Sequence, residues 1–271
     1  MNKFRFISLV VISAVIFSCC QRVIHIDLNT ANSKVVIEAY VTDQPGRDTV
    51  KLTRTGSYFT PGNYPTINNA LVIISDNTGI NDTLTQIDSG RYSSPILTGV
   101  PGRTYTLKVI TNGTEYDAVS TMPYPITMDT VVAVFDKIVT LNGVDDSTYR
   151  IRCLFQDPPG FGNFYRAQLI VNGQLYDSLG NVTLYEDKYV DGTIVNLRLR
   201  GYSPKYGDSA RVDLMCIDAN TYKYFSVVRS ISGNGNPIST ATPQNPPTNI
   251  IGGALGYFSA YPVKSSTILV Q

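Results

Sequence analysis

Alternation of apolar and polar residues is the feature that most limits how this chain can fold. It begins after Lys34, where Val35, Ile37, Ala39 and Val41 alternate with more polar neighbours, and it returns in short segments along the chain. Because successive side chains of a strand point to opposite faces, a period of two predicts β-strands with one buried face. Asp outnumbers Glu by 18 to 3, which agrees, because Asp is favoured in turns and Glu in helix interiors. The sequence therefore predicts an all-β fold.

Turn residues divide these segments into hairpins and into two domains. Asn-Gly pairs at 112–113 and 172–173 lie between alternating runs and predict tight hairpins. Pro123 and Pro125 interrupt the alternation, because proline cannot donate a hydrogen bond to a sheet. We therefore expect two β-sandwich-like domains, one over residues 34–122 and one over residues 128–271.

One segment of the second domain has helical spacing instead. Asp218 can cap a run in which Tyr222, Phe225 and Val228 recur at intervals of three, and the run stops near Gly233. We expect a short helix near 219–232, followed by a long loop rich in proline.

The N-terminus has the pattern of an export signal. Lys3 and Arg5 precede the apolar run 6–17, which is shorter than the roughly 20 residues that span a bilayer. The run ends in Ile-Phe-Ser-Cys at 16–19, which resembles a bacterial lipobox. This implies a signal peptide over residues 1–18, acylation of Cys19 and a tether over residues 19–33. An ordinary signal peptide, or acylation of Cys20, remains an alternative.

Charge and composition argue against several classes of function. The net charge of +1 becomes −1 when Lys3 and Arg5 are lost with the signal peptide, so the chain has no basic field for nucleic acid. The sequence contains one His, in the expected tether, and no Trp. We find no catalytic set, metal site or cofactor motif and expect a protein that is not an enzyme. The adjacent carboxylates Asp145 and Asp146 are expected to be solvated.

Two cysteines are expected in the second core. Cys153 and Cys216 each share a strand face with apolar residues. Export permits a disulfide between them, but two buried free thiols are equally compatible with the pattern.

Two loops rich in aromatic residues are the candidate surfaces for a partner. They contain Tyr58, Phe59 and Tyr64 in the first domain and Phe161, Phe164 and Tyr165 in the second. Aromatic side chains are favoured at the centres of interfaces. The alternative for each of them is packing at the rim of its own sandwich.

Several motifs together resemble known modules of exported bacterial proteins. Gly90-x-Tyr92 and Gly102-x-x-Tyr105-x-Leu107 resemble the signature of immunoglobulin-like and carboxypeptidase-regulatory-like sandwiches. The lipobox, the opening strand 35–42, the segment 155–165 and above all the Gly-Gly-x-x-Gly-Tyr-Phe run at 252–258 resemble the domain-of-unknown-function family forty-two forty-nine. Members of this family are envelope lipoproteins whose genes often lie beside those of outer-membrane TonB-dependent receptors, so the resemblance implies a cell-envelope accessory protein. We expect it to bind a partner, an outer-membrane receptor, in nutrient uptake. An adhesion or structural lipoprotein without a role in transport is the alternative.

Two further features bear on the cellular setting. Surface lipoproteins of such bacteria commonly carry acidic residues after the acylated Cys, whereas Gln21 and Arg22 stand here. The sequence therefore leaves two locations open, on the cell-surface face or on the periplasmic face of the outer membrane. Six sites resemble an O-glycosylation signal of Asp, then Ser or Thr, then an apolar residue or Thr. They are Thr49, Thr83, Thr130, Ser147, Ser178 and Ser209. The same pattern also arises where Asp ends a turn and Thr begins a strand.

Overall fold

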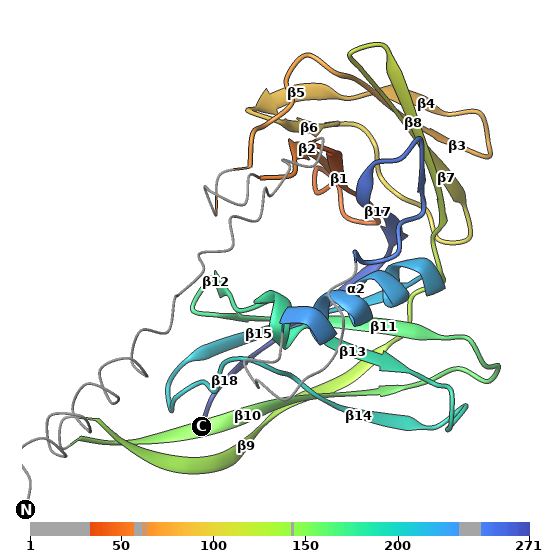
Figure 1. Cartoon of the computed structure of the whole chain (residues 1–271). Helices are drawn as coiled ribbons and strands as arrows, with labels where there is room; N and C mark the ends of the chain where they lie inside the picture. The colour runs from red at the N-terminus through yellow and green to blue at the C-terminus, as the bar shows by residue number, and fades with distance from the viewer. Residues whose placement is uncertain (1–32, 57–61, 63, 142–143, 233–244) are drawn as a thin grey trace, which may run out of the picture. The chain divides into compact units, whose positions relative to one another are not determined.

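Two hydrophobic cores, each enclosed by two sheets, organise the chain (Figure 1). The structure is a computed structural model that describes residues 33–56, 62, 64–141, 144–232 and 245–271. The predicted signal peptide, the tether before residue 33 and Cys19 lie outside the described residues. The all-β expectation is confirmed, since strands form both halves of the described chain and α2 is the one α-helix in these ranges.

The first half is a sandwich of two five-stranded sheets. One sheet has the order β17 (Leu255–Tyr261), β1 (Val35–Thr42), β2 (Thr49–Arg54), β6 (Arg91–Ser93) and β5 (Thr85–Asp88). The other has the order β16 (Ile250–Ile251), β8 (Thr114–Thr121), β7 (Thr104–Thr111), β3 (Leu71–Asp76) and β4 (Asn81–Thr83). Ile37, Leu52 and Leu107 are among the fully buried residues between the sheets.

The second half contains longer strands. A three-stranded sheet has the order β14 (Ile194–Arg198), β10 (Val144–Gln156) and β9 (Met128–Leu141). A five-stranded sheet has the order β12 (Gln174–Leu175), β11 (Phe164–Val171), β15 (Ser209–Ile217) and β18 (Val263–Leu269), and β13 (Thr183–Glu186) also pairs with β11. A single 3-10 turn, η1 (Leu179–Asn181), precedes β13. The second core lies between these sheets.

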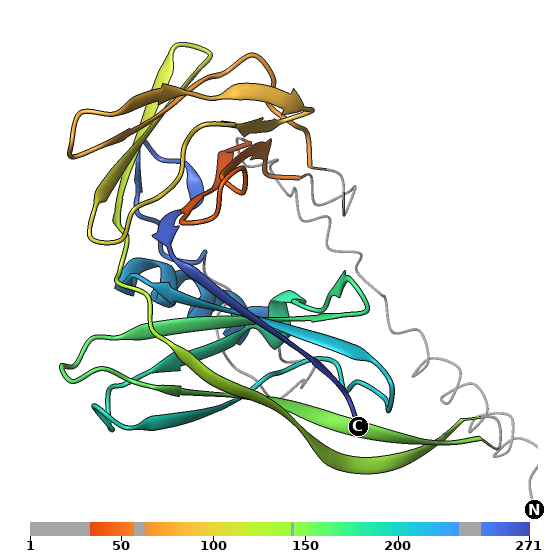
Figure 2. The ribbon, with the colours of Figure 1, turned by 180° about the vertical axis from the view of Figure 1, so that it is seen from behind.

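The end of the chain belongs to both halves. Strand β17 runs parallel to β1, with Ile37 opposite Gly256, and so completes the first sandwich. After Pro262 the chain continues as β18, which pairs with β15 in the second half. Figure 2 shows this dark blue segment running from one half to the other. The division of the chain into residues 34–122 and 128–271 stays a prediction, but β16 and β17 pair with the first of these segments.

The predicted helix is present as α2 (Ala219–Ser232). Its cap is the expected one, because the backbone amide of Thr221 donates to Oδ1 of Asp218 over 2.8 Å. The other carboxylate oxygen of Asp218 accepts a hydrogen bond from Ser120 in β8. The cap therefore also attaches the start of the helix to the first sandwich. Among the described residues, no helix is long and apolar enough to cross a membrane.

Candidate functional site

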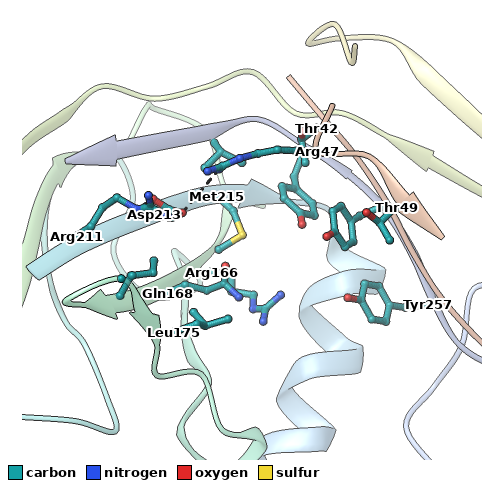
Figure 3. A pocket seen from close by; sticks show the side chains of 15 residues that line it. Thr42, Arg47, Thr49, Arg166, Gln168, Leu175, Arg211, Asp213, Met215 and Tyr257 are labelled. Atoms are coloured by element: carbon teal, nitrogen blue, oxygen red, sulfur yellow. Dashed lines mark hydrogen bonds and ion pairs between the residues drawn. The ribbon is translucent and has the colours of Figure 1, made fainter. Parts of the chain in front are cut away.

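A cavity of about 460 Å³ lies where the two halves meet (Figure 3). Strands β1, β2 and β17 line it from the first half, and β11, β12, β15 and β18 line it from the second. A small cluster of buried apolar residues, which includes Met215 and Tyr261, connects the halves beside it.

The lining comes from strand faces that point away from the two cores. Tyr40 and Thr42 alternate along β1 with residues of the first core. Arg211, Asp213 and Met215 alternate in the same way along β15 with residues of the second core. The period of two therefore places polar and aromatic side chains in the cavity while the alternate residues remain in the cores.

One wall of the cavity is aromatic. The rings of Tyr40 and Tyr261 have centroids 5.8 Å apart, and Tyr257 packs against Tyr224 and Phe225 of α2 at 4.8 and 4.9 Å. Burial raises the pKa of Tyr257 and of Tyr261 above the ordinary range of tyrosine. Their hydroxyl groups therefore stay protonated at neutral pH and can donate hydrogen bonds.

Arg166 brings a buried positive charge to the cavity. Only 8% of the residue is exposed, and its guanidinium carbon lies 4.0 Å from the centroid of the Phe225 ring. The guanidinium pairs with Asp177, whose carboxylate also accepts a hydrogen bond of 2.7 Å from Gln168. Burial lowers the pKa of Arg166, but the charge and hydrogen bond of Asp177, together with Tyr257 and Tyr261, outweigh burial, and the pKa lies above its ordinary value. Figure 3 shows the side chain pointing into the middle of the cavity.

A second group of charges lies around Asp213, which is also buried. Its carboxylate accepts a hydrogen bond of 2.7 Å from the hydroxyl of Ser265. Arg211 pairs with it at 3.1 Å and Arg47 at 3.9 Å. Both arginine side chains are partly exposed, so they form a basic rim held by a buried carboxylate.

Comparison with known proteins assigns the family. The model of the family described as Domain of unknown function (DUF4249) matches residues 21–267. The chain belongs to this family. No curated protein is similar to the sequence.

The Gly-Gly-x-x-Gly-Tyr-Phe run at 252–258 of this DUF4249 protein shapes the cavity wall. Gly256 has a φ of +104°, and a Cβ atom added to it would lie 2.0 Å from the carbonyl oxygen of Ile37. The run therefore permits the close approach of β17 to β1 and sets Tyr257, its next residue, in the wall. Gly252 and Gly256 therefore act through close packing of the backbone.

A cluster of carboxylates lies in the loops of the second half. The oxygens of Asp157, Asp187 and Asp191 lie within 4.8 Å of one another, and the first two residues are buried. Asp157 accepts a hydrogen bond of 2.5 Å from the hydroxyl of Tyr165. Asp187 and Asp191 accept bonds from the backbone amides of Gly162 and Gly160, at 3.0 and 2.8 Å. These bonds join the loop at 157–163 to the loop at 187–193.

The described members of the two predicted aromatic loops differ in exposure. Tyr58 and Phe59 lie outside the described residues. Tyr64 and Phe161 are exposed, whereas the ring of Phe164 packs 5.0 Å from Tyr222 of α2. Tyr165 is buried and packs against Phe155 at 4.8 Å. Tyr165 is thus a core residue, as the alternative of internal packing expects, and only exposed members of the set stay candidates for contact with a partner.

Phe164 and Tyr165 nevertheless take part in a second cavity, of about 600 Å³. The proline-rich linker at 123–126 and the start of α2 line it with them. Cys216 also borders this cavity. The segment that interrupts the strand alternation thus covers one end of the second half.

The two cysteines of the second core are free and buried in the structure. Burial raises the pKa of the Cys153 thiol to about 12 and that of Cys216 to about 11. Both thiols therefore stay protonated at neutral pH and act as small apolar groups. The disulfide that the sequence left open is not formed in this structure.

The predicted O-glycosylation sites are mostly accessible. Thr83, Thr130, Ser178 and Ser209 are exposed, whereas Thr49 and Ser147 are half-buried. Their modification stays a prediction. Thr49 also lines the cavity between the halves.

Sequence reasoning missed the residues that line this cavity. Arg166, Gln168, Arg211 and Asp213 lie in strands whose alternate residues are apolar, and a period of two alone places such polar residues on the solvent-facing side. The available signal was that two arginines, Arg166 and Arg211, lie on this face of the sheet. Nothing in the neighbouring sequence identifies the strands of the first half that cover this face.

Proposed function

We propose that this DUF4249 member is a lipid-anchored cell-envelope binding protein. In this proposal, Cys19 carries the lipid, the cavity between the halves holds a ligand, and the protein is an accessory to an outer-membrane TonB-dependent receptor in nutrient uptake. The resemblance of the N-terminus to a lipobox supports the anchor, and the resemblance to envelope lipoproteins supports the receptor as partner.

The observation that carries a binding role is the composition of the cavity. Binding sites combine apolar walls with a few convergent polar groups, and here three tyrosines face buried charged groups on the opposite strands. The cavity volume of about 460 Å³ suits one small molecule. Among the described residues we find no paired nucleophile and base in this cavity, so binding is the function that its geometry supports best.

Replacing Cys19 with alanine tests the anchor. We expect Cys19→Ala to move from the membrane fraction to the soluble fraction, because loss of the acylated thiol removes the chains that hold the protein to the bilayer. Fractionation with metabolic labelling by a fatty acid measures this. Cys20→Ala is the matched control and should stay in the membrane fraction with its label. Release by Cys20→Ala alone would place the lipid on the second cysteine.

Crosslinking in intact cells tests the partner. We expect mass spectrometry of the crosslinked complex to identify one outer-membrane receptor in near-stoichiometric amount, and Cys19→Ala to lose it with the anchor. Recovery of matrix components or of proteins from other cells instead would favour the adhesion or structural alternative.

A further inference from the structure

We propose that the cavity between the halves binds a small organic acid, with the ligand carboxylate on the guanidinium of Arg166 and the ligand body against the tyrosine wall. This inference rests on the proposed binding function and adds the chemical class of the ligand. It stands on the burial, partners and surroundings of Arg166.

Arg166 has donor capacity that the protein does not use. A guanidinium carries five N–H donors, and Asp177 takes up one side of it. The Nε of Arg166 is buried and has no hydrogen-bond partner in the described chain. An unpaired buried donor is costly to the folded state. Arg166 also lines the cavity, so a ligand acceptor there would meet a guanidinium whose donors are only partly used by the protein.

The balance of charge selects an anion. Three arginines, at positions 47, 166 and 211, line the cavity, and Asp213 is the one carboxylate among its lining residues. Asp177, which does not line the cavity, neutralises Arg166. Asp213 neutralises one of the other two arginines, so the group has one positive charge in excess. Arg47 and Arg211 lie at the exposed rim. Positive potential that is focused at a partly enclosed rim attracts anions from solution.

The remaining lining describes the body of the ligand. Tyr257 and Tyr261 offer flat apolar faces next to hydroxyl donors. Gln168, Thr42 and Thr49 add amide and hydroxyl groups around the same space. A ligand with an acid group at one end and a ring bearing hydroxyls at the other would satisfy both sets of groups. Guanidinium pairs with planar carboxylate through parallel hydrogen bonds, so we commit to a carboxylate.

Calorimetry on the mature lipidated chain in detergent tests this inference. The probes are D-glucuronate with D-glucose and 4-hydroxybenzoate with 4-hydroxybenzamide, and each pair differs in the acid group. We expect at least one acid to bind at least about tenfold more tightly than its neutral partner, as for a hydrogen bond to a charged group. Inorganic phosphate should bind more weakly than that acid. Binding of neither acid, equal binding within both pairs, or tighter binding of phosphate would overturn the proposal.

Variants locate the binding. Arg166→Gln combined with Asp177→Asn removes both charges of the pair, so neither is left buried alone, and it should weaken acid binding at least about tenfold. Arg91→Gln in β6, outside the cavity lining, is the matched control and should bind as the wild type does. If the double variant does not fold, Arg211→Gln at the rim replaces it and should weaken binding several-fold. Unchanged binding by a folded cavity variant would contradict the assignment.

The outcomes for the ligand and for the proposed function are separable. Acid binding by the purified chain without any receptor in the crosslinked complex would remove the accessory role and keep the ligand class. Recovery of a receptor partner together with no acid binding would keep the accessory role and remove the ligand class.

Discussion

Replacing Gly256 with alanine is expected to destabilise the protein by about 2–5 kcal/mol. The residue has a φ of +104°, and a left-handed conformation costs an L-residue roughly 1–2 kcal/mol. The new methyl group would also lie 2.0 Å from the carbonyl oxygen of Ile37, and overpacking adds about 1–3 kcal/mol. Urea unfolding of the two proteins, followed by circular dichroism, measures the difference in the free energy of unfolding.

Gly253→Ala is the matched control for this prediction. Gly253 also has a positive φ, of +87°, but a Cβ atom there would meet nothing within 4 Å. We expect the free energy of unfolding of Gly253→Ala to fall only by the cost of the left-handed conformation, about 1–2 kcal/mol. Equal losses for the two variants would show that the approach of β17 to β1 is not tight at this point.

Local signals predicted the elements that depend on a few neighbouring residues. Asn112 and Gly113 have φ values of +50° and +75°, and their hairpin joins β7 to β8 in the expected register. Such a turn is determined by the two residues that tolerate positive φ. The cap of α2 at Asp218 is local in the same sense. These features could be predicted because their cause lies within one turn of the chain.

The cavity could not be predicted, because its walls come from strands that are distant in sequence. Tyr257 and Glu38 are opposite each other in β17 and β1, and no local pattern specifies that parallel pairing. Arg166 in β11 is buried on the face that a period of two assigns to solvent. Packing between the two halves covers this face, so burial there depends on tertiary structure. The glycine run was the one sequence signal of the pairing between β17 and β1, because glycine permits two backbones to approach closely.

The stability of the protein is expected to fall as pH rises from about 4 to 7, because of one buried carboxyl group. Asp48 is fully buried before β2, and burial raises the pKa of its carboxyl to about 7 despite a hydrogen bond from the amide of Thr42. The nearby charge of Asp82 contributes in the same direction as burial. One oxygen of Asp48 accepts the Thr42 amide at 2.6 Å, and the other has no hydrogen-bond partner in the described chain.

The direction of this pH dependence follows from proton binding in the folded and unfolded states. The folded-state pKa of Asp48 lies above the value of 3.8 expected for an unperturbed aspartate. Between these pH values the folded state retains a proton that the unfolded state has released, so this stabilising contribution is complete below about pH 4 and is lost as pH approaches 7. At about 1.4 kcal/mol for each pH unit, the loss amounts to at most about 4 kcal/mol.

Asp48→Asn should remove this dependence, because asparagine keeps the acceptor for Thr42 without a titrating proton. We expect the variant to be more stable than the wild type at pH 8, by up to about 4 kcal/mol, and similar to it at pH 4. The difference between the two free energies of unfolding, measured by urea at several pH values, isolates this group from all others that titrate. Asp88→Asn, at an exposed position of β5, is the control and should give a nearly constant difference. A wild type that gains stability relative to Asp48→Asn between pH 5 and 7 would mean that the carboxylate has a favourable partner at this position.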